Sequence, residues 1–214
     1  MQDPSQRTRT LLTVAVFSLS GYLSAQVHIS YSSWVDALIK SNDTAALHKY
    51  SAGNLIFFLF EFPVALTLAM LVAKSAGWLG HVNLWQGAAG LMPVYLVPGP
   101  VIILSSLTFF VLTIPCLAVA ALVLALSLKF ITSKWSSKLF LGFLISGAIS
   151  VVFWFLVGIG PAKNNMDMAW STFFISLHVM WAGIFGMGLA VPPNVRLQQT
   201  RNGVPLISTQ PRSN

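Results

Sequence analysis

Glu61 is the residue of this chain whose type and position point most directly to chemistry. It is the only charged side chain well inside a strongly apolar run, which extends from Leu55 to Val72. A carboxylate near the middle of a bilayer costs on the order of several kcal/mol unless it is paired, hydrated or protonated. Glu61 is therefore a candidate proton or cation site. The alternative is a neutral carboxylic acid that hydrogen-bonds a neighbouring helix.

His178 is the second candidate. It lies about nine residues into the last apolar run, and Glu61 lies about nine residues into its own run. If both runs cross inward, both side chains lie roughly 14 Å below the outer boundary, because a helix rises about 1.5 Å per residue. Equal depth allows a Glu–His pair that would act as a proton relay. The alternative for His178 is a structural hydrogen bond to a neighbouring helix.

Asn54 extends this candidate intramembrane site. It precedes Glu61 by seven residues and so shares its helix face. Pro63, two residues after Glu61, cannot donate a backbone hydrogen bond and predicts a kink.

A third polar cluster lies in the glycine-rich segment 76–98 and consists of His81, Asn83 and Gln86. If this segment crosses the membrane, these side chains need a wet or protein-lined environment, and they are candidates for a polar lining. If it does not cross, they lie at the membrane interface beside the tryptophans of the same segment.

Small residues recur every four positions in two of the apolar runs. Such ridges let helices approach closely, either within one chain or between partners. The candidate packing residues are Gly142, Ser146 and Ser150 in one run, and Ala182, Gly186 and Ala190 in the other.

Several chemistries find no support in the sequence. There is no phosphate-binding glycine loop with its lysine, no HExxH and no GxSxG. The four histidines are too scattered to indicate a metal site, and the single cysteine, Cys116, lies in an apolar run. We therefore expect no catalytic residue, no cofactor, no metal and no enzymatic activity.

The composition defines the class of protein. Of the 214 residues, 56% are hydrophobic and 8% are charged, and the mean hydropathy is +0.76. Soluble domains carry about 25% charged residues, so a soluble globular protein, a disordered chain and a coiled coil are all excluded. The 12 basic residues are scattered between apolar runs, which is typical of topology signals rather than of a nucleic-acid interface. The pattern predicts an all-α integral membrane protein.

Apolar runs of about 20 residues predict the membrane-spanning helices, because backbone in hydrocarbon must satisfy its own hydrogen bonds. Segment 76–98 is a weaker sixth span, and the number of spans falls to five if it is re-entrant or interfacial. The predicted spans are 10–29, 52–73, 76–98, 101–128, 139–160 and 169–191.

Basic residues favour six spans with both termini in the cytoplasm. That arrangement places nine Lys and Arg residues inside and three outside, whereas five spans give at best eight against four. Residues 1–191 then form a single transmembrane domain, with an outer interfacial segment over 31–50 and a disordered basic cytoplasmic tail over 192–214. The first run also resembles a signal peptide with cleavage after Ala25, although an uncleaved helix is favoured.

Two functions fit these features. The first is an accessory or protective component of a membrane assembly, acting through helix–helix contacts, as the small-residue ridges and scarce buried polar groups suggest. The alternative is a small, proton-linked transporter or channel-like protein that uses Glu61 and His178. In both cases we expect a multi-pass protein of the bacterial cytoplasmic (inner) membrane. Its partners would be the lipid bilayer and other membrane subunits or further copies of itself, with no nucleic acid.

Overall fold

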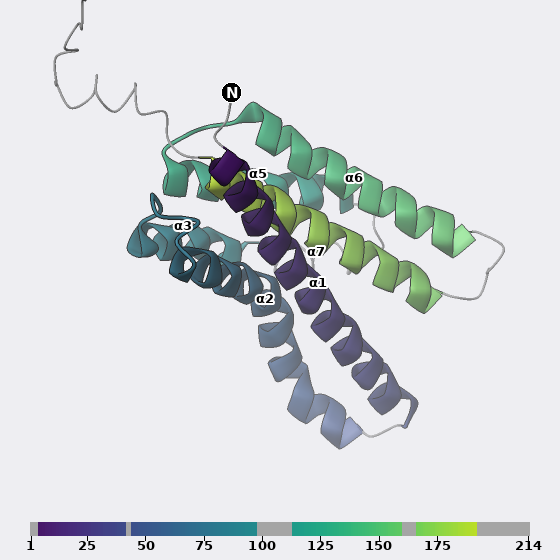
Figure 1. The fold of residues 1–214 in the computed structure, drawn as a ribbon. Coiled ribbons are helices and arrows are strands. Elements are labelled where there is room, and N and C mark those ends of the chain that lie inside the picture. The colour runs from purple at the N-terminus through teal and green to yellow at the C-terminus, as the bar shows by residue number, and fades with distance from the viewer. Residues whose placement is uncertain (1–3, 42–43, 98–112, 160–165, 192–214) are drawn as a thin grey trace, which may run out of the picture.

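The chain folds into helices only, over the part that the structure describes. The computed structural model describes residues 4–41, 44–97, 113–159 and 166–191; the side chains of 44–59 and of a few other helical positions lie outside the description. The helices are α1 (Pro4–Lys40), α2 (Thr44–Ser75), α3 (Leu84–Leu96), α5 (Thr113–Thr132), α6 (Ser137–Ile159) and α7 (Met166–Ala190) (Figure 1).

Four of these helices contain stretches long and apolar enough to cross a membrane. The stretches are Ser5–Tyr31 in α1, Ile114–Thr132 in α5, Ser137–Gly158 in α6 and Met168–Ala190 in α7. A span needs about 20 residues, because a helix of that length rises about 30 Å. The predicted all-helical, membrane-type class is confirmed at this level.

Helix boundaries differ from the predicted spans in two places. Of the predicted interfacial segment 31–50, residues 31–40 form the last turns of α1 and residues 44–50 form the first turns of α2. Segment 76–98 divides into a turn and the 13-residue helix α3, which at about 1.5 Å per residue is roughly 20 Å long. The first part of the predicted span 101–128 and the tail 192–214 lie outside the described residues.

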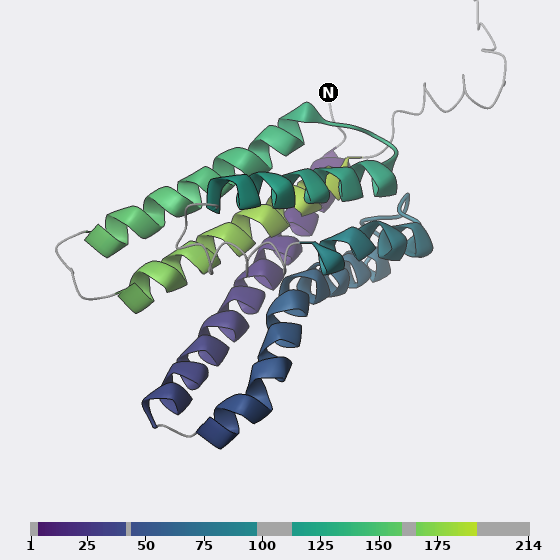
Figure 2. The same cartoon turned by 180° about the vertical axis from the view of Figure 1, so that it is seen from behind.

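Helix α7 packs between α1 on one side and α6 on the other (Figures 1 and 2). The fully buried rings of Phe17 and Phe185 lie 6.2 Å apart between α1 and α7. Towards α6, the indole nitrogen of Trp181 donates a hydrogen bond to the carbonyl of Phe143 at 3.0 Å. These contacts make α7 the centre of the core.

The small residues at the α1–α7 contact allow the two backbones to come very close. A Cβ added at Gly21 would lie 2.3 Å from the carbonyl oxygen of His178 and 2.9 Å from the Cβ of Ala182. A Cβ added at Gly186 would lie 2.8 Å from Phe17. Only residues without a side chain fit at these two glycines.

The two predicted ridges pack inside the chain. Ala182 and Gly186 face α1, as just described, and Ala190 is buried near the end of α7. The nearest side chain to a Cβ added at Gly142 is Ile184 of α7, at 3.7 Å. Ser146 and Ser150 are buried, and their hydroxyls donate to carbonyls of their own helix.

Helices α2 and α3 are joined by a turn that Lys74 stabilises. Its ammonium donates to the carbonyls of Leu79, Gly80 and Val82 at 3.1, 3.0 and 2.5 Å. Gly77 adopts a φ of 76° in this turn, a left-handed conformation that glycine takes without steric cost. The turn thereby directs α3 back against α2, where the hydroxyls of Thr67 and Tyr95 are 2.9 Å apart.

Most of the described basic side chains gather at one end of the helix bundle. The start of α1, the α2–α3 turn, the α5–α6 connection and the end of α7 meet there. The end of α1, the start of α2, the end of α6 and the start of α7 lie towards the opposite end (Figures 1 and 2). We call the first of these the basic end, and it carries Arg7, Arg9, Lys74, Lys129, Lys134 and Lys138. Lys40 lies at the opposite end.

Candidate functional site

Three titratable side chains from three helices meet inside the bundle. They are His28 of α1, Glu61 of α2 and His178 of α7, which we call the carboxyl–imidazole cluster. The side chains of His28 and Glu61 are 6% and 5% exposed, and His178 is 3% exposed. The close α1–α7 contact between Gly21 and the backbone of His178 holds these two helices together beside the cluster.

A hydrogen bond joins Nδ1 of His28 to Oε1 of Glu61. The imidazole of His178 approaches edge-on, with its ring centre 6.1 Å from that of His28 and an interplanar angle of 81°. Aromatic rings enclose the group. The ring of Phe62 stacks on that of His178 with 4.9 Å between the ring centres, and the ring centre of Phe174 lies 3.9 Å from that of His28. The cluster is thus a polar centre with apolar walls.

Hydrogen-bonding capacity is left over in this centre. Within the described part of the chain, Oε2 of Glu61, Nδ1 of His178 and Oγ of Ser24 are buried and have no hydrogen-bond partner. Buried polar atoms are almost always paired, since leaving one unpaired costs about 1–3 kcal/mol. Such unsatisfied atoms are typical of a site that accepts a proton, a water molecule or a ligand.

The arrangement suits proton binding. A carboxyl group and an imidazole nitrogen share one hydrogen-bonded proton, which either group is able to hold. The second imidazole offers a further acceptor or donor close by. A buried group of this kind changes its net charge by one unit when a proton enters or leaves.

Glu61 and His178 lie in one cluster, as their equal depth allows, but the direct hydrogen bond of Glu61 is with His28. Sequence reasoning missed His28, because it treated the four histidines as scattered. A signal was present in the spacing. Phe17, Gly21, Ser24 and His28 recur at intervals of three or four residues, so they line one face of a helix. The three of them that carry side chains are at most 5% exposed as whole residues.

The other residue predicted for the intramembrane site is Asn54. It belongs to α2, but its side chain lies outside the described residues. Pro63 lies within α2, whose helix continues through it, and its carbonyl accepts a hydrogen bond from the Thr67 hydroxyl at 2.9 Å.

The polar residues of segment 76–98 lie at the basic end, apart from the cluster. His81 donates from Nε2 to the carbonyl of Leu189 at 2.9 Å. Asn83 caps the start of α3, where its side-chain oxygen accepts from the Trp85 amide at 3.0 Å. Gln86 donates to the carbonyl of Phe130 at 2.7 Å. The bond of His81 ties the α2–α3 turn to the end of α7, and the bond of Gln86 ties the start of α3 to the end of α5.

Burial lowers the pKa of His81, and the charges of Lys74 and Lys134 lower it further, against the opposing effect of the Leu189 carbonyl. The imidazole is therefore neutral at neutral pH and bonds as a donor at Nε2. This is the behaviour of a structural contact between helix ends.

Metal and thiol chemistry are not indicated in the described ranges. No group of three or more His, Cys, Asp and Glu side chains there has an arrangement that would hold a metal ion. Cys116 is buried in α5 as a free thiol.

No protein-family model, no curated protein and no solved structure matches this chain. The geometry of the site is therefore the basis for its function.

Proposed function

We propose that this chain is a small multi-pass membrane protein that moves protons across the membrane, as a proton-linked transporter or channel-like protein, with the carboxyl–imidazole cluster as its proton-binding centre. The observation that carries the proposal is the buried hydrogen bond between His28 and Glu61, beside a second imidazole and a carboxyl oxygen that has no partner among the described residues. Ionisable groups inside a membrane are costly, so they mark sites of function by default. No enzymatic reaction enters this proposal.

The distribution of charged and aromatic side chains supports a membrane placement with the basic end in the cytoplasm. Cytoplasmic loops collect Lys and Arg, and tryptophan concentrates at both membrane interfaces. Trp78, Trp85 and Trp135 lie towards the basic end, whereas Trp34, Trp154 and Trp170 lie towards the opposite end. Along α7, Trp170 and Ala190 are 20 residues apart, which corresponds to about 30 Å, the thickness of the hydrocarbon core.

The cluster then lies inside the hydrocarbon region. Glu61 is 13 residues from Lys74 along α2, or about 20 Å from the basic boundary. His178 is eight residues from Trp170 along α7, or about 12 Å from the other boundary. A proton-binding group at this depth is the minimum that a membrane proton pathway requires.

The accessory role is less well supported by the packing. It was based on scarce buried polar groups and on ridges of small residues, which pack either within one chain or against a partner. The described contacts of these ridges lie within the chain. We therefore place transport ahead of assembly. The bacterial cytoplasmic membrane and an assembly with lipid or further subunits remain part of the proposal.

Six spans with both termini in the cytoplasm give a direct topology prediction. Green fluorescent protein fused after Asn214 is expected to fluoresce, and alkaline phosphatase fused there to stay inactive, because the basic end is retained inside. Phosphatase inserted between Asn42 and Asp43 is the matched control and should be active. Active phosphatase after Asn214 would overturn the six-span arrangement.

Proton flux tests the proposed function. The full chain is reconstituted in liposomes that contain a pH-sensitive dye, and a potassium diffusion potential drives protons inward. We expect the wild type to acidify the lumen faster than protein-free liposomes do. Glu61→Gln should reduce the rate to that background, because an amide does not bind a proton in the same range.

Asp36→Asn is the matched control for this experiment, since it removes one carboxylate from α1 eight residues beyond His28. It should leave the flux unchanged. Wild-type flux in Glu61→Gln, or no flux above background in the wild type, would contradict proton transport through this cluster.

A further inference from the structure

A groove between α1 and α2 leads to the cluster. Its volume is about 670 Å³, within the range of about 300–1,000 Å³ that takes drug-sized molecules. The walls are mostly aliphatic, and Leu19, Leu23 and Leu68 on its rim are 58%, 55% and 56% exposed. In a membrane these exposed leucines face lipid, so the groove is open sideways to the bilayer.

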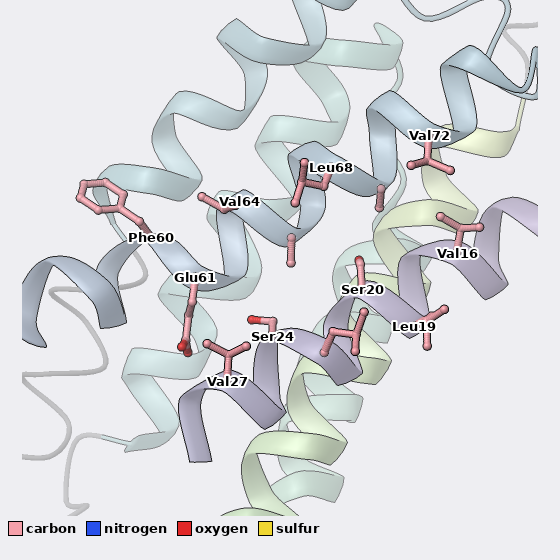
Figure 3. A pocket seen from close by; sticks show the side chains of 13 residues that line it. Val16, Leu19, Ser20, Ser24, Val27, Phe60, Glu61, Val64, Leu68 and Val72 are labelled. Carbon is pink, nitrogen blue, oxygen red and sulfur yellow. The ribbon is translucent and has the colours of Figure 1, made fainter. Parts of the chain in front are cut away.

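The polar end of the groove carries an acid. Glu61 and Ser24 line it together, and Figure 3 shows both side chains at the same end, beside Val27. The side chain of Glu61 is 5% exposed, its Oε1 is bonded to His28, and its Oε2 has no partner within the described part of the chain. Oε2 is itself buried, so an occupant of the groove reaches this unpaired oxygen only when the side chain of Glu61 turns outward.

The charge of the groove is of one sign. Glu61 is the only ionisable side chain among the described residues that line it, and none of them is basic. Phe60 adds an aromatic ring to the wall beside Glu61. A carboxylate and an aromatic face both attract positive charge, and aliphatic walls favour an apolar body.

We propose that the groove between α1 and α2 binds lipophilic organic cations, with the apolar body against the aliphatic walls and the positive charge at Oε2 of Glu61. This inference rests on the proposed function and names the substrate class of the same site. A cation that reaches the groove from the bilayer would meet the carboxyl without crossing the bundle.

Binding of a cation exchanges it for the proton of Glu61. The protonated carboxyl and a free cation give a carboxylate–cation pair and one released proton, so charge in the groove is conserved. An isolated charge in hydrocarbon is costly, so binding of the cation and release of the proton occur together. Among the described residues, the titratable groups near Glu61 are His28 of α1, which is bonded to it, and His178 of α7, which lies beside His28. Tyr95 of α3 is bonded to Thr67, six residues further along α2.

The test measures binding of tetraphenylphosphonium to the purified full chain in detergent, by equilibrium dialysis against detergent alone. We expect saturable binding of one cation per chain, with release of about one proton in weak buffer. Tetraphenylborate has the same shape and the opposite charge, and it should not bind. Binding of both ions alike would mean an apolar groove without charge selectivity, and would overturn the proposal.

Two variants and a control locate the site. Glu61→Gln should raise the apparent Kd for tetraphenylphosphonium by about tenfold or more and abolish proton release. Val64→Trp fills the groove from a position that is 42% exposed and leaves the carboxyl in place, and it should weaken binding as strongly. Asp36→Asn should bind as the wild type does. Wild-type affinity in Glu61→Gln or in Val64→Trp would overturn the proposal.

The outcome separates this inference from the proposed function. Proton flux that depends on Glu61, without binding of tetraphenylphosphonium, would refute the cation site and leave proton transport standing. Binding at Glu61 without any proton flux would refute transport and leave the cation site standing.

Discussion

Gly21→Ala is expected to destabilise the protein by about 3 kcal/mol, the upper part of the range for overpacked cores. The added methyl group would lie 2.3 Å from the backbone oxygen of His178. A side chain is able to rotate away from such a contact, but the backbone of α7 moves only if the α1–α7 interface separates. The same movement would displace His178 from His28, so this change should also lower proton flux.

Gly142→Ala is the matched control for this prediction. A Cβ at that position meets nothing closer than the Cδ1 of Ile184 at 3.7 Å, which is ordinary van der Waals contact. Because alanine is the better helix former, its effect should lie between neutral and a gain of roughly 1 kcal/mol. Thermal unfolding in detergent, followed by size-exclusion chromatography, measures both variants. Equal stability of the two would mean that α1 and α7 are not in contact at Gly21.

The class of fold was predictable from the sequence because hydrocarbon restricts the backbone so strongly. Runs such as 139–160 and 169–191 correspond closely to α6 and α7. The ends of α1 and α3 were harder to predict from the sequence, because they depend on tertiary packing. The polar last turns of α1 lie beyond the apolar run, and α3 is set by a turn that Lys74 stabilises through three carbonyls.

The candidate site was predictable in part. Glu61 and His178 stand out because charge and imidazole are rare in apolar runs, and equal depth placed them at one level. The partner of Glu61 was not predictable from depth alone. His28 lies close to the predicted end of its run, and the four histidines were interpreted as scattered. The packing of α1 against α2, which is a tertiary feature, brings it beside Glu61.

The hydrogen bond between His28 and Glu61 should appear as an energetic coupling between these two residues. In a double-mutant cycle of His28→Ala and Glu61→Gln, we expect a coupling free energy of about 1–2 kcal/mol. Hydrogen bonds within membranes couple by about 0.6 kcal/mol on average, with a maximum near 1.7, and charge-assisted bonds are stronger. Unfolding in mixed detergent micelles, titrated with a denaturing detergent, gives the free energies of the four proteins.

A second cycle, of Glu61→Gln with His178→Ala, discriminates the observed arrangement from the direct Glu61–His178 pair that equal depth suggested. His178 meets the cluster through its edge contact with His28 at 6.1 Å, so its coupling to Glu61 should be below about 0.5 kcal/mol. His81→Ala at the basic end is the distant control and should be additive with Glu61→Gln within about the same limit. A larger coupling free energy between Glu61 and His178 than between Glu61 and His28 would contradict the observed hydrogen bond. It would mean that α7, rather than α1, holds the proton partner of the carboxyl.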